Sequence, residues 1–279
     1  MKKVAIIGYG FVGQGMSKIF PDAIIYDPFK GTTTSKEQVN ECDLAIVCVP
    51  TAPKGMGEQK VNADESEYLE ANLSIVEEVL GWLKTPLKLI KSTVPPGTTY
   101  KLNRKFGYKY GYDTICFSPE YMGEGNYYVP PKYPDPLDPR KHDFMIIGGN
   151  KTACEEILAI FMRKLGPAKR YLIMDSEEAE LVKYMENTWG AMKVSFCNQW
   201  YDICKLFDAS YEVVREGFLA DSRTEPMHTA VFKDKRGFGG KCYPKDLLAI
   251  VGACKKKGFT PDLLKEVWET NKKHLKKNV

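Results

Sequence analysis

The sequence predicts an α/β protein in which parallel strands alternate with helices, followed by a long connecting helix and a small all-α domain. Three observations support this fold class. Short apolar runs recur along the first half, one long helical pattern follows them, and only helical patterns come after it. With 279 residues, of which 43% are hydrophobic and 27% are charged, the chain can form one large or two modest globular domains.

Six short apolar runs are the predicted strands. Each run is continuous rather than alternating, which is typical of strands buried on both faces of a parallel sheet. Helical patterns lie between them, such as residues 66–84, and this alternation indicates crossovers in an open, doubly wound sheet. The predicted strands are residues 4–7, 23–26, 44–49, 87–90, 114–117 and 144–147.

Residues 126–140 break this rhythm and are predicted to form a loop. The segment is rich in proline and tyrosine, and proline cannot supply the hydrogen bonds of a helix interior or a strand ladder. A long loop inside a compact domain is either a binding element or a plain surface excursion, and the sequence leaves both open.

One uninterrupted helical pattern covers residues 176–206. Glu177, Glu178 and Glu180 lie near its start, where acidic side chains favour a helix N-terminus. Three shorter helical patterns follow, at residues 211–218, 244–256 and 261–276. The predicted domains are therefore residues 1–174, with the sheet, and residues 175–279, with the long helix and the helical domain.

Composition and charge argue against several classes of protein. The formal net charge of +4 is too small to indicate a nucleic-acid partner, and the late lysine cluster fits a solvated helix face. No apolar run approaches the roughly 20 residues of a membrane span. No cleavable leader pattern is present, so we expect a cytoplasmic location with reduced thiols. The eight cysteines show no C-x-x-C pair and the three histidines are scattered, so no metal site is predicted.

A G-x-G-x-x-G motif follows the first predicted strand and opens a helical pattern. Asp27 ends the second predicted strand, about 20 residues beyond the first glycine. This context is the dinucleotide-binding fingerprint of a Rossmann-type sheet, in which the glycines permit a tight turn, close approach of a pyrophosphate and close helix packing. Asp27 would accept hydrogen bonds from the adenosine ribose, which favours NAD over NADP. The predicted cofactor contacts of this loop are Gly8, Gly10, Phe11, Val12 and Gly13.

The most unusual stretch is GFGGKCYPKD at residues 237–246. Its glycines let backbone pack closely against a ligand. Cys242 lies just before Pro244, which suits the first turn of a helix, so the helix end and the neighbouring Lys241 and Lys245 should favour the thiolate. Such a cysteine can trap an aldehyde as a thiohemiacetal and carry it to a thioester. The alternative is a structural cysteine buried after a glycine turn.

Four blocks, in this order along the chain, resemble the UDP-glucose/GDP-mannose dehydrogenase family. They are GYGFVG at 8–13, STVPPGTT at 92–99, SPEYMGEG at 118–125 and GFGGKCYPKD at 237–246, with a weaker fifth block, AELVKYMEN, at 179–187. The resemblance implies NAD as cofactor and a nucleotide sugar as substrate. It implies that the sugar 6-hydroxyl is oxidised to the carboxylate, as in the conversion of UDP-glucose to UDP-glucuronate.

The resemblance also implies roles for single residues. Cys242 is the nucleophile, and Lys183 and Asn187 flank the reacting carbon; their spacing places both on one helix face. A lysine there can stabilise an oxyanion. Glu120 resembles the acid/base glutamate of thioester hydrolysis. Taken singly, each of these residues other than Cys242 could equally have an ordinary structural role.

The remaining implied residues complete the site. Thr93 and Asp246 position water or assist proton transfer. The implied cofactor contacts beyond the glycine loop are Asp27, Thr51, Thr93 and Glu124, and the implied substrate contacts are Lys183, Asn187, Arg223, Phe238 and Gly239.

Members of the family carry a third domain that closes over the nucleotide, whereas this sequence ends at Val279. We therefore expect a truncated form that lacks the C-terminal UDP-binding domain. The resemblance further implies a homodimer through the long helix 176–206, whose broad apolar face contains Trp189, Met192, Phe196 and Trp200.

Two alternative functions remain open from the sequence. One is a 3-hydroxyacid dehydrogenase of the 6-phosphogluconate type, which combines similar domains but needs no nucleophilic cysteine. The other is an inactive remnant that binds NAD.

Overall fold

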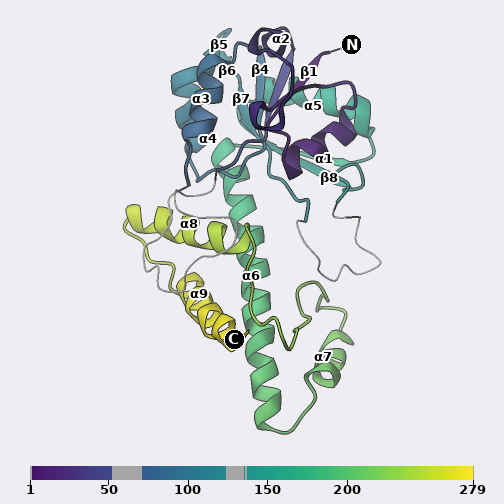
Figure 1. Ribbon diagram of the computed structural model, residues 1–279, viewed down its shortest axis with the longest axis vertical. Coiled ribbons are helices and arrows are strands. Elements are labelled where there is room, and N and C mark those ends of the chain that lie inside the picture. Colours follow the sequence, from purple (N-terminus) through teal and green to yellow (C-terminus); the bar gives the residue numbers. More distant parts are fainter. Residues whose placement is uncertain (1, 52–70, 124–134, 136, 279) are drawn as a thin grey trace. The chain divides into compact units, whose positions relative to one another are not determined.

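The computed structural model describes residues 2–51, 71–123, 135 and 137–278, which form two compact units (Figure 1). The first unit contains the described residues up to Lys183, and the second begins at Tyr184.

A seven-stranded sheet with the order β2-β1-β3-β4-β7-β8-β9 forms the centre of the first unit. The first five of these strands are parallel to one another, β8 runs antiparallel to β7, and β9 runs parallel to β8. The strands are β1 Val4–Ile7, β2 Ile24–Tyr26, β3 Leu44–Val47, β4 Leu87–Ile90, β7 Ile115–Phe117, β8 Phe144–Gly148 and β9 Arg170–Met174.

The predicted α/β class and the Rossmann-type sheet are confirmed, with two corrections to the strands. The sheet is not parallel throughout, because β8 reverses direction after β7. A parallel step needs a crossover, usually a helix, and the proline-rich segment between these strands has no helical pattern. The sequence also missed β9, whose residues are half-buried or exposed and therefore form no continuous apolar run.

Helices cover both faces of this sheet (Figure 1). Helices α1 (Phe11–Ile19) and α5 (Lys151–Leu165) pack on one face. Helices α2 (Lys36–Asn40), α3 (Ser74–Trp82) and α4 (Thr98–Leu102) pack on the other.

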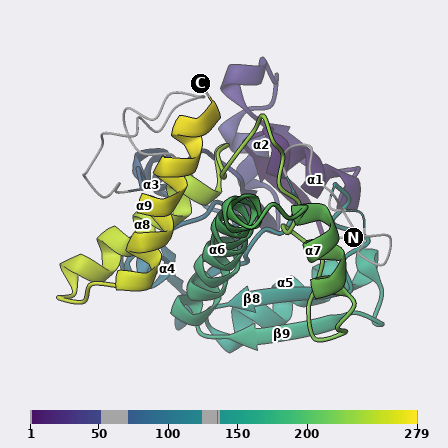
Figure 2. The same cartoon turned by 90° about the horizontal axis from the view of Figure 1, so that it is seen from below.

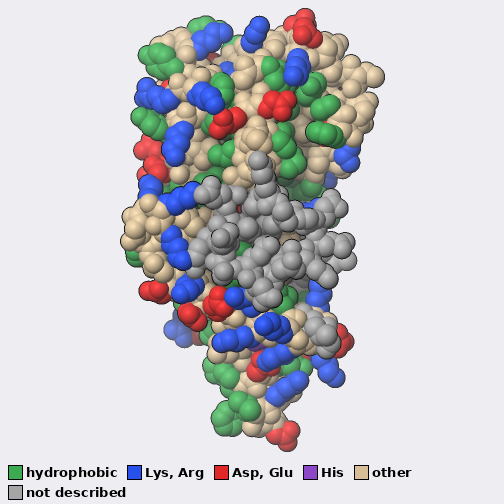
Figure 3. Space-filling view, turned by 60° about the vertical axis from the view of Figure 1, so that its left-hand side comes forward, with side chains coloured by type: hydrophobic (Ala, Val, Ile, Leu, Met, Phe, Trp, Pro, Cys, Tyr) green, Lys and Arg blue, Asp and Glu red, His purple; other side chains and the backbone are tan. Residues whose placement is uncertain are grey.

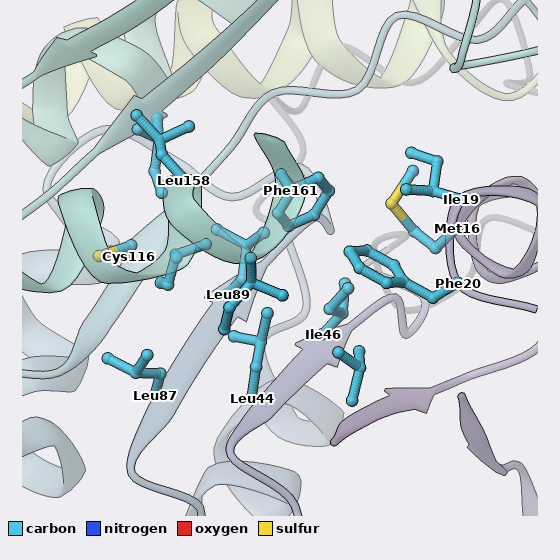
Figure 4. Packing of buried hydrophobic residues seen from close by; sticks show 14 of the residues in the cluster. Met16, Ile19, Phe20, Leu44, Ile46, Leu87, Leu89, Cys116, Leu158 and Phe161 are labelled. Carbon is cyan, nitrogen blue, oxygen red and sulfur yellow. The ribbon is translucent and has the colours of Figure 1, made fainter. Parts of the chain in front are cut away.

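Figure 4 shows part of the core on the first face. Side chains of α1 and α5 meet those of the central strands there. The rings of Phe20 and Phe161 make an edge-to-face contact, with centroids 4.9 Å apart. These apolar contacts hold α1 against the sheet.

The helix predicted at residues 66–84 is shorter where the structure describes it. Residues 71–73 are not helical, and α3 begins at Ser74. The side chain of Asn72 accepts a hydrogen bond from the amide of Ser74 at 3.1 Å, which satisfies an amide at the helix start and sets its boundary. Residues 66–70 lie outside the described part, as do 126–134 and 136 of the predicted loop.

The first unit has further short elements. They are the 3-10 turn η1 (Pro28–Lys30), the π-helical turn η2 (Asn103–Gly107) and the antiparallel strands β5 (Tyr108–Lys109) and β6 (Tyr112–Asp113). Figure 3 shows basic, acidic and hydrophobic side chains intermixed on one face of this unit.

Helix α6 (Ser176–Leu206) begins in the first unit and continues into the second. The second unit also contains α7 (Tyr211–Leu219), α8 (Tyr243–Lys256), α9 (Asp262–Leu275) and the 3-10 turn η3 (Lys276–Asn278). Helices α8 and α9 lie side by side (Figure 2). The predicted helices of this half are confirmed, because their boundaries lie within two residues of those observed. None of the helices that the structure describes has the length and apolar character needed to cross a membrane.

The core of the second unit changes one prediction about α6. Met192 packs against the buried cluster that contains Phe238 and Trp268, so it does not belong to the exposed apolar face. Trp189, Phe196 and Trp200 are exposed, by 51%, 52% and 41%. At 3.6 residues per turn, Trp189, Phe196 and Trp200 point in nearly one direction, and Met192 lies about 60° around the helix from Trp189, on the side of the core.

Candidate functional site

The structure brings five predicted residues to one edge of the sheet. Each one follows the carboxyl end of a different parallel strand: Gly8 after β1, Asp27 after β2, Thr51 after β3, Thr93 after β4 and Glu120 after β7. In open α/β sheets, ligands bind at this edge.

The glycine loop after β1 is shaped by its backbone. Gly8 has a φ of +87°, and a Cβ atom on it would lie 2.6 Å from the carbonyl oxygen of Cys48. A Cβ on Gly13 would lie 2.0 Å from the carbonyl oxygen of Gly8. Gly10, the N-cap of α1, has open space at its Cβ position and makes no side-chain cap bond. The loop therefore fits a dinucleotide, because a pyrophosphate can approach Gly10 and the amides at the start of α1.

Asp27 is buried next to this loop. Its Oδ2 accepts a hydrogen bond from the Tyr9 amide at 2.7 Å, and its Oδ1 accepts one from the Phe29 amide at 3.0 Å. Each carboxylate oxygen keeps a lone pair that could accept from a ribose hydroxyl. Phe11 and Val12 form the first turn of α1, as the predicted cofactor contacts require.

The ends of β3 and β4 are joined by side-chain hydrogen bonds. The Oγ1 atom of Thr51 donates to the carbonyl oxygen of Thr93 at 2.7 Å, and the Oγ atom of Ser92 donates to that of Val49 at 2.7 Å. These bonds fix the backbone of Thr93 beside the predicted cofactor contact Thr51. Glu124 lies outside the described residues.

The carboxylate of Glu120 is buried and surrounded by donors. Its Oε1 accepts hydrogen bonds from the amides of Tyr121 and Met122, at 2.8 and 2.9 Å, and its Oε2 lies 3.1 Å from Nζ of Lys91. Burial alone would raise the pKa of Glu120, but the charge of Lys91, the Met122 amide and the charge of Lys183 outweigh it and lower this pKa. At neutral pH the group is therefore a carboxylate, which suits a base rather than an acid.

Lys183 lies near the same segment. Its ammonium group donates a hydrogen bond to the backbone carbonyl of Glu120 and lies 5.3 Å from the centre of the Tyr121 ring. The structure thus brings together the predicted residues Lys183 and Glu120, both in the first unit.

Two buried charges of this unit escaped prediction as site residues. Lys91 also donates to the carbonyl oxygen of Pro119 at 2.9 Å, which ties β4 to the Glu120 segment. Glu180, expected only as an acid near a helix start, is buried and bonded to the segment after β4. A signal for Lys91 existed in the sequence, since a charge directly follows the apolar run 87–90.

Cys242 is the N-cap of α8 in the second unit, and it is exposed. The other seven cysteines are buried or half-buried, and all eight belong to the described part. The alternative of a structural cysteine buried after a glycine turn is therefore wrong for Cys242. A thiol at a helix N-terminus lies in the positive field that favours its thiolate.

Asn187 and Asp246 form a buried pair in the same unit. The Nδ2 atom of Asn187 donates to Oδ2 of Asp246 at 2.5 Å, and the ammonium group of Lys245 pairs with Oδ1. The amide of Asp246 donates to the carbonyl oxygen of Cys242 at 2.9 Å. The first turn of α8 thus links the cysteine to the Asn187–Asp246 pair, which brings together three predicted residues.

Side chains of α6 and α9 hold the backbone of the glycine loop before Cys242. The side chain of Asn271 accepts from the Phe238 amide at 2.7 Å and donates to the Phe238 carbonyl at 2.9 Å. The Oδ1 atom of Asn198 accepts from the Gly237 amide at 3.1 Å. Phe238 is thus an anchor whose backbone groups are already engaged, while Gly239 is exposed with open space at its Cβ position. A substrate contact at either residue stays a prediction.

Arg223 is paired with a nearby acid rather than with the residues above. Its guanidinium forms a bidentate pair with the carboxylate of Asp221, two positions away, and the side chain is exposed. The structure connects it with no other predicted site residue in the described part, and its role stays a prediction. Among the described residues, no three His, Cys, Asp or Glu side chains are grouped as metal ligands.

Comparison with known families decides the identity of the chain. Residues 14–165 match the UDP-glucose/GDP-mannose dehydrogenase family, NAD binding domain, and residues 177–273 match the central domain of the same family. The chain belongs to the UDP-glucose/GDP-mannose dehydrogenase family. The predicted family and the predicted cofactor, NAD, are thereby confirmed.

Individual relatives agree with this assignment. The chain is 29% identical over 263 residues to the UDP-glucose 6-dehydrogenase of Rickettsia bellii, covering 92% of this chain and 55% of that relative. It therefore spans about half the length of the curated relatives that it matches.

Two solved structures share the fold. A UDP-glucose dehydrogenase from Pyrobaculum islandicum superposes with a TM-score of 0.76 at 23% identity, covering 98% of this chain and 68% of that one. The 3-hydroxyisobutyrate dehydrogenase of Mycobacterium tuberculosis superposes with a TM-score of 0.65 at 13% identity, covering 99% and 95%. At these identities the likeness concerns the fold alone.

Proposed function

We propose that this chain catalyses the NAD-dependent oxidation of a nucleotide-sugar 6-hydroxyl to the carboxylate, with UDP-glucose converted to UDP-glucuronate. The observation that carries the proposal is the chemical character of Cys242. It is an exposed cysteine at a helix N-terminus, linked to a buried asparagine–aspartate pair, in a family of sugar-nucleotide dehydrogenases.

The proposed reaction has two oxidations and one hydrolysis. When bound, NAD accepts a hydride from the sugar carbon in each oxidation, so two NAD are consumed per sugar. The thiolate of Cys242 adds to the aldehyde formed first, and the resulting thiohemiacetal is oxidised to a thioester. Water then breaks the carbon–sulfur bond, which releases the carboxylate and regenerates the thiolate. In balance, one alcohol, one water and two NAD⁺ give one carboxylate, two NADH and three protons.

The residues of the first unit have roles in this scheme. Glu120, which Lys91 and two amides keep ionised, acts as the base for the water that attacks the thioester. The ammonium group of Lys183 stabilises negative charge on the substrate oxygen during addition and hydrolysis. Thr93 positions the water or assists proton transfer.

The residues of the second unit act on the same chemistry. Cys242 supplies the nucleophile, and the field of the α8 N-terminus favours the thiolate. Asn187 donates from its amide to a substrate oxygen, while Asp246 fixes the orientation of that amide. Lys245 neutralises the buried Asp246 carboxylate, which would otherwise be costly.

We also propose a homodimer that forms through α6. Trp189, Phe196 and Trp200 are each at least 41% exposed on this helix. A helix face with several exposed aromatic side chains is typical of a protein interface. A Trp189→Glu/Trp200→Glu variant should sediment as a monomer while the unaltered protein sediments as a dimer. A monomeric unaltered protein would contradict this proposal.

The test of the proposed function is a panel of substrates scored by NADH formation. UDP-glucose, other UDP-sugars, GDP-mannose and small 3-hydroxyacids are incubated with NAD and the protein. The proposal predicts NADH from UDP-glucose and its loss in Cys242→Ala. NADH from 3-hydroxyacids, retained in Cys242→Ser, would instead establish a 3-hydroxyacid dehydrogenase. NAD binding without NADH from any compound would establish an inactive remnant.

A further inference from the structure

Glu180 is a buried carboxylate of the first unit to which the proposed chemistry gives no role. It lies on α6 and its side chain is 0% exposed. Its Oε2 accepts a hydrogen bond from the Gly97 amide at 2.6 Å, and its Oε1 accepts from the Thr99 amide at 2.8 Å and the Thr99 hydroxyl at 2.6 Å. All three donors belong to the segment that follows β4.

These bonds replace a missing helix cap. Helix α4 begins at Thr98, and its N-cap is Gly97, which has a φ of +84° and no side chain to bond the free amides. The first amides of a helix have no partner within it. Glu180, more than 80 positions further along the chain, satisfies two amides here, and a carboxylate suits the positive end of a helix.

The other end of this segment carries Thr93. Its carbonyl oxygen is held by the hydroxyl of Thr51, at 2.7 Å. Residues 93–99 are therefore fixed at both ends, by Thr51 on one side and by Glu180 on the other. Lys183 follows Glu180 by three positions on α6 and donates to the Glu120 carbonyl, so a single helix turn contacts both segments.

We propose that Glu180 is a positioning residue for the dehydrogenase reaction, which holds the Thr93 segment in register with Lys183. It acts through Gly97 and Thr99 and touches neither substrate nor cofactor. This inference rests on the proposed function, because Thr93 and Lys183 are assigned to that reaction.

A carboxylate at this buried position carries a desolvation penalty. Burial raises the pKa of Glu180 to about 7, in spite of the three hydrogen bonds, and the charge of Glu177 adds to the rise. No basic side chain is among the partners found for Glu180 in the described residues. An apolar residue would avoid this penalty but would leave the Gly97 and Thr99 amides without their acceptor, so the carboxylate serves the geometry of the Gly97–Thr99 segment.

The test compares Glu180→Gln with Glu178→Gln, at an exposed acid two positions earlier on α6 that lies on a different face of the helix. Gln keeps the size of Glu180 but turns one acceptor oxygen into a donor, which faces the donors of the segment. With UDP-glucose and NAD, kcat should fall at least tenfold in Glu180→Gln and stay within twofold in Glu178→Gln. A purely structural role predicts a lower melting temperature with unchanged kcat.

A second readout does not depend on the reaction. Hydrogen exchange at the Gly97 and Thr99 amides should be at least tenfold faster in Glu180→Gln than in the unaltered protein, and unchanged in Glu178→Gln. If no nucleotide sugar yields NADH, the proposed function fails while exchange still decides whether Glu180 holds the segment. Should Glu180→Gln not fold, Thr99→Val removes one donor and should lower kcat alone. Unaltered kcat, or unaltered exchange at both amides, would overturn the proposal.

Discussion

The Nζ atom of Lys91 lies 3.1 Å from Oε2 of Glu120, and both side chains are buried. Lys91 stands directly after β4, and Glu120 follows β7, the neighbouring parallel strand. The lysine also bonds the Pro119 carbonyl, so it positions the carboxylate as well as neutralising it. The ionisation state of Glu120 therefore depends on a residue that is itself no candidate for contact with substrate.

Replacing Lys91 should change the pH dependence of the reaction. The lysine lowers the pKa of Glu120, so in Lys91→Met this pKa rises, and the acid limb of kcat/KM moves to higher pH by about 1–3 units. Lys91→Arg keeps the charge and should shift the limb less. Lys101→Met, which removes an exposed lysine of α4, is the matched control and should leave the profile in place. An acid limb that does not move in Lys91→Met would exclude Glu120 as the base.

The two glycines of the cofactor loop should respond differently to an added methyl group. Gly13→Ala should prevent folding, because its Cβ would lie 2.0 Å from the Gly8 carbonyl oxygen. Gly10→Ala should fold, within about 1 kcal/mol of the unaltered protein, since its Cβ meets open space. It should nevertheless bind NADH at least tenfold more weakly, because the methyl group occupies the approach of the pyrophosphate. Fluorescence titration with NADH and thermal unfolding measure both effects.

Gly217→Ala provides the control for this pair. The residue lies inside α7 with open space at its Cβ position, far along the chain from the cofactor loop. Alanine should stabilise the helix by about 1 kcal/mol without changing NADH affinity. Equal NADH affinity in Gly10→Ala and Gly217→Ala would contradict the assignment of the loop.

Asp27 should set the preference for NAD over NADP. Its carboxylate lies at the end of β2 with two backbone amides as partners, so it is rigid and negatively charged. Asp27→Asn removes the charge that repels a 2′-phosphate, and the ratio of kcat/KM for NAD to that for NADP should fall at least tenfold. Asp22→Asn, at an exposed acid, should leave the ratio unchanged. An unchanged ratio in Asp27→Asn would place the ribose elsewhere.

The stability of the first unit should depend on Lys88. This lysine is buried in β4, with the Thr85 carbonyl 3.0 Å from its Nζ atom, and burial lowers its pKa to about 8. The unfolded state binds its proton up to about pH 10.5, so between about pH 8 and 10.5 stability rises with pH. The full penalty at neutral pH is roughly 3 kcal/mol.

Lys88→Met removes this penalty and should raise the free energy of unfolding at pH 7, with the difference shrinking toward pH 10. Urea unfolding at both pH values measures it. Lys84→Met, at the exposed residue before the strand, should show no such dependence on pH. A constant difference between Lys88→Met and the unaltered protein at both pH values would mean that Lys88 does not titrate as described.

The sequence predicted those elements that local patterns determine. Helix α6 has the predicted boundaries, because 31 residues contain no proline and carry suitable acids at the start. The glycine turn between β1 and α1 was also predicted, since the spacing of its glycines reflects local contacts such as that of Gly13 with Gly8. Strand β9 was not predicted, because it is an edge strand without a continuous apolar run. The antiparallel direction of β8 was not predicted, because apolar runs contain no information on strand direction.

The site residues divide in the same way, into those that local patterns predict and those that only the fold brings together. Cys242 was found from its loop, and Asp246 follows it by four positions, about one helix turn. Lys91 and Glu120 are 29 positions apart, and Thr99 and Glu180 are 81 positions apart. Only the folded sheet and α6 bring these pairs into contact. Resemblance to a family supplied Lys183 and Asn187, whereas spacing alone left each of them an ordinary helix residue.

The central claim is that Cys242 carries the substrate through a thioester, and it is tested most directly by the number of NADH formed per sugar consumed. With limiting UDP-glucose and excess NAD, the account predicts two NADH per sugar and a uronate product. Cys242→Ala should form no uronate, because the aldehyde has no thiol to add to. One NADH per sugar in the unaltered protein, or two in Cys242→Ala, would contradict the account.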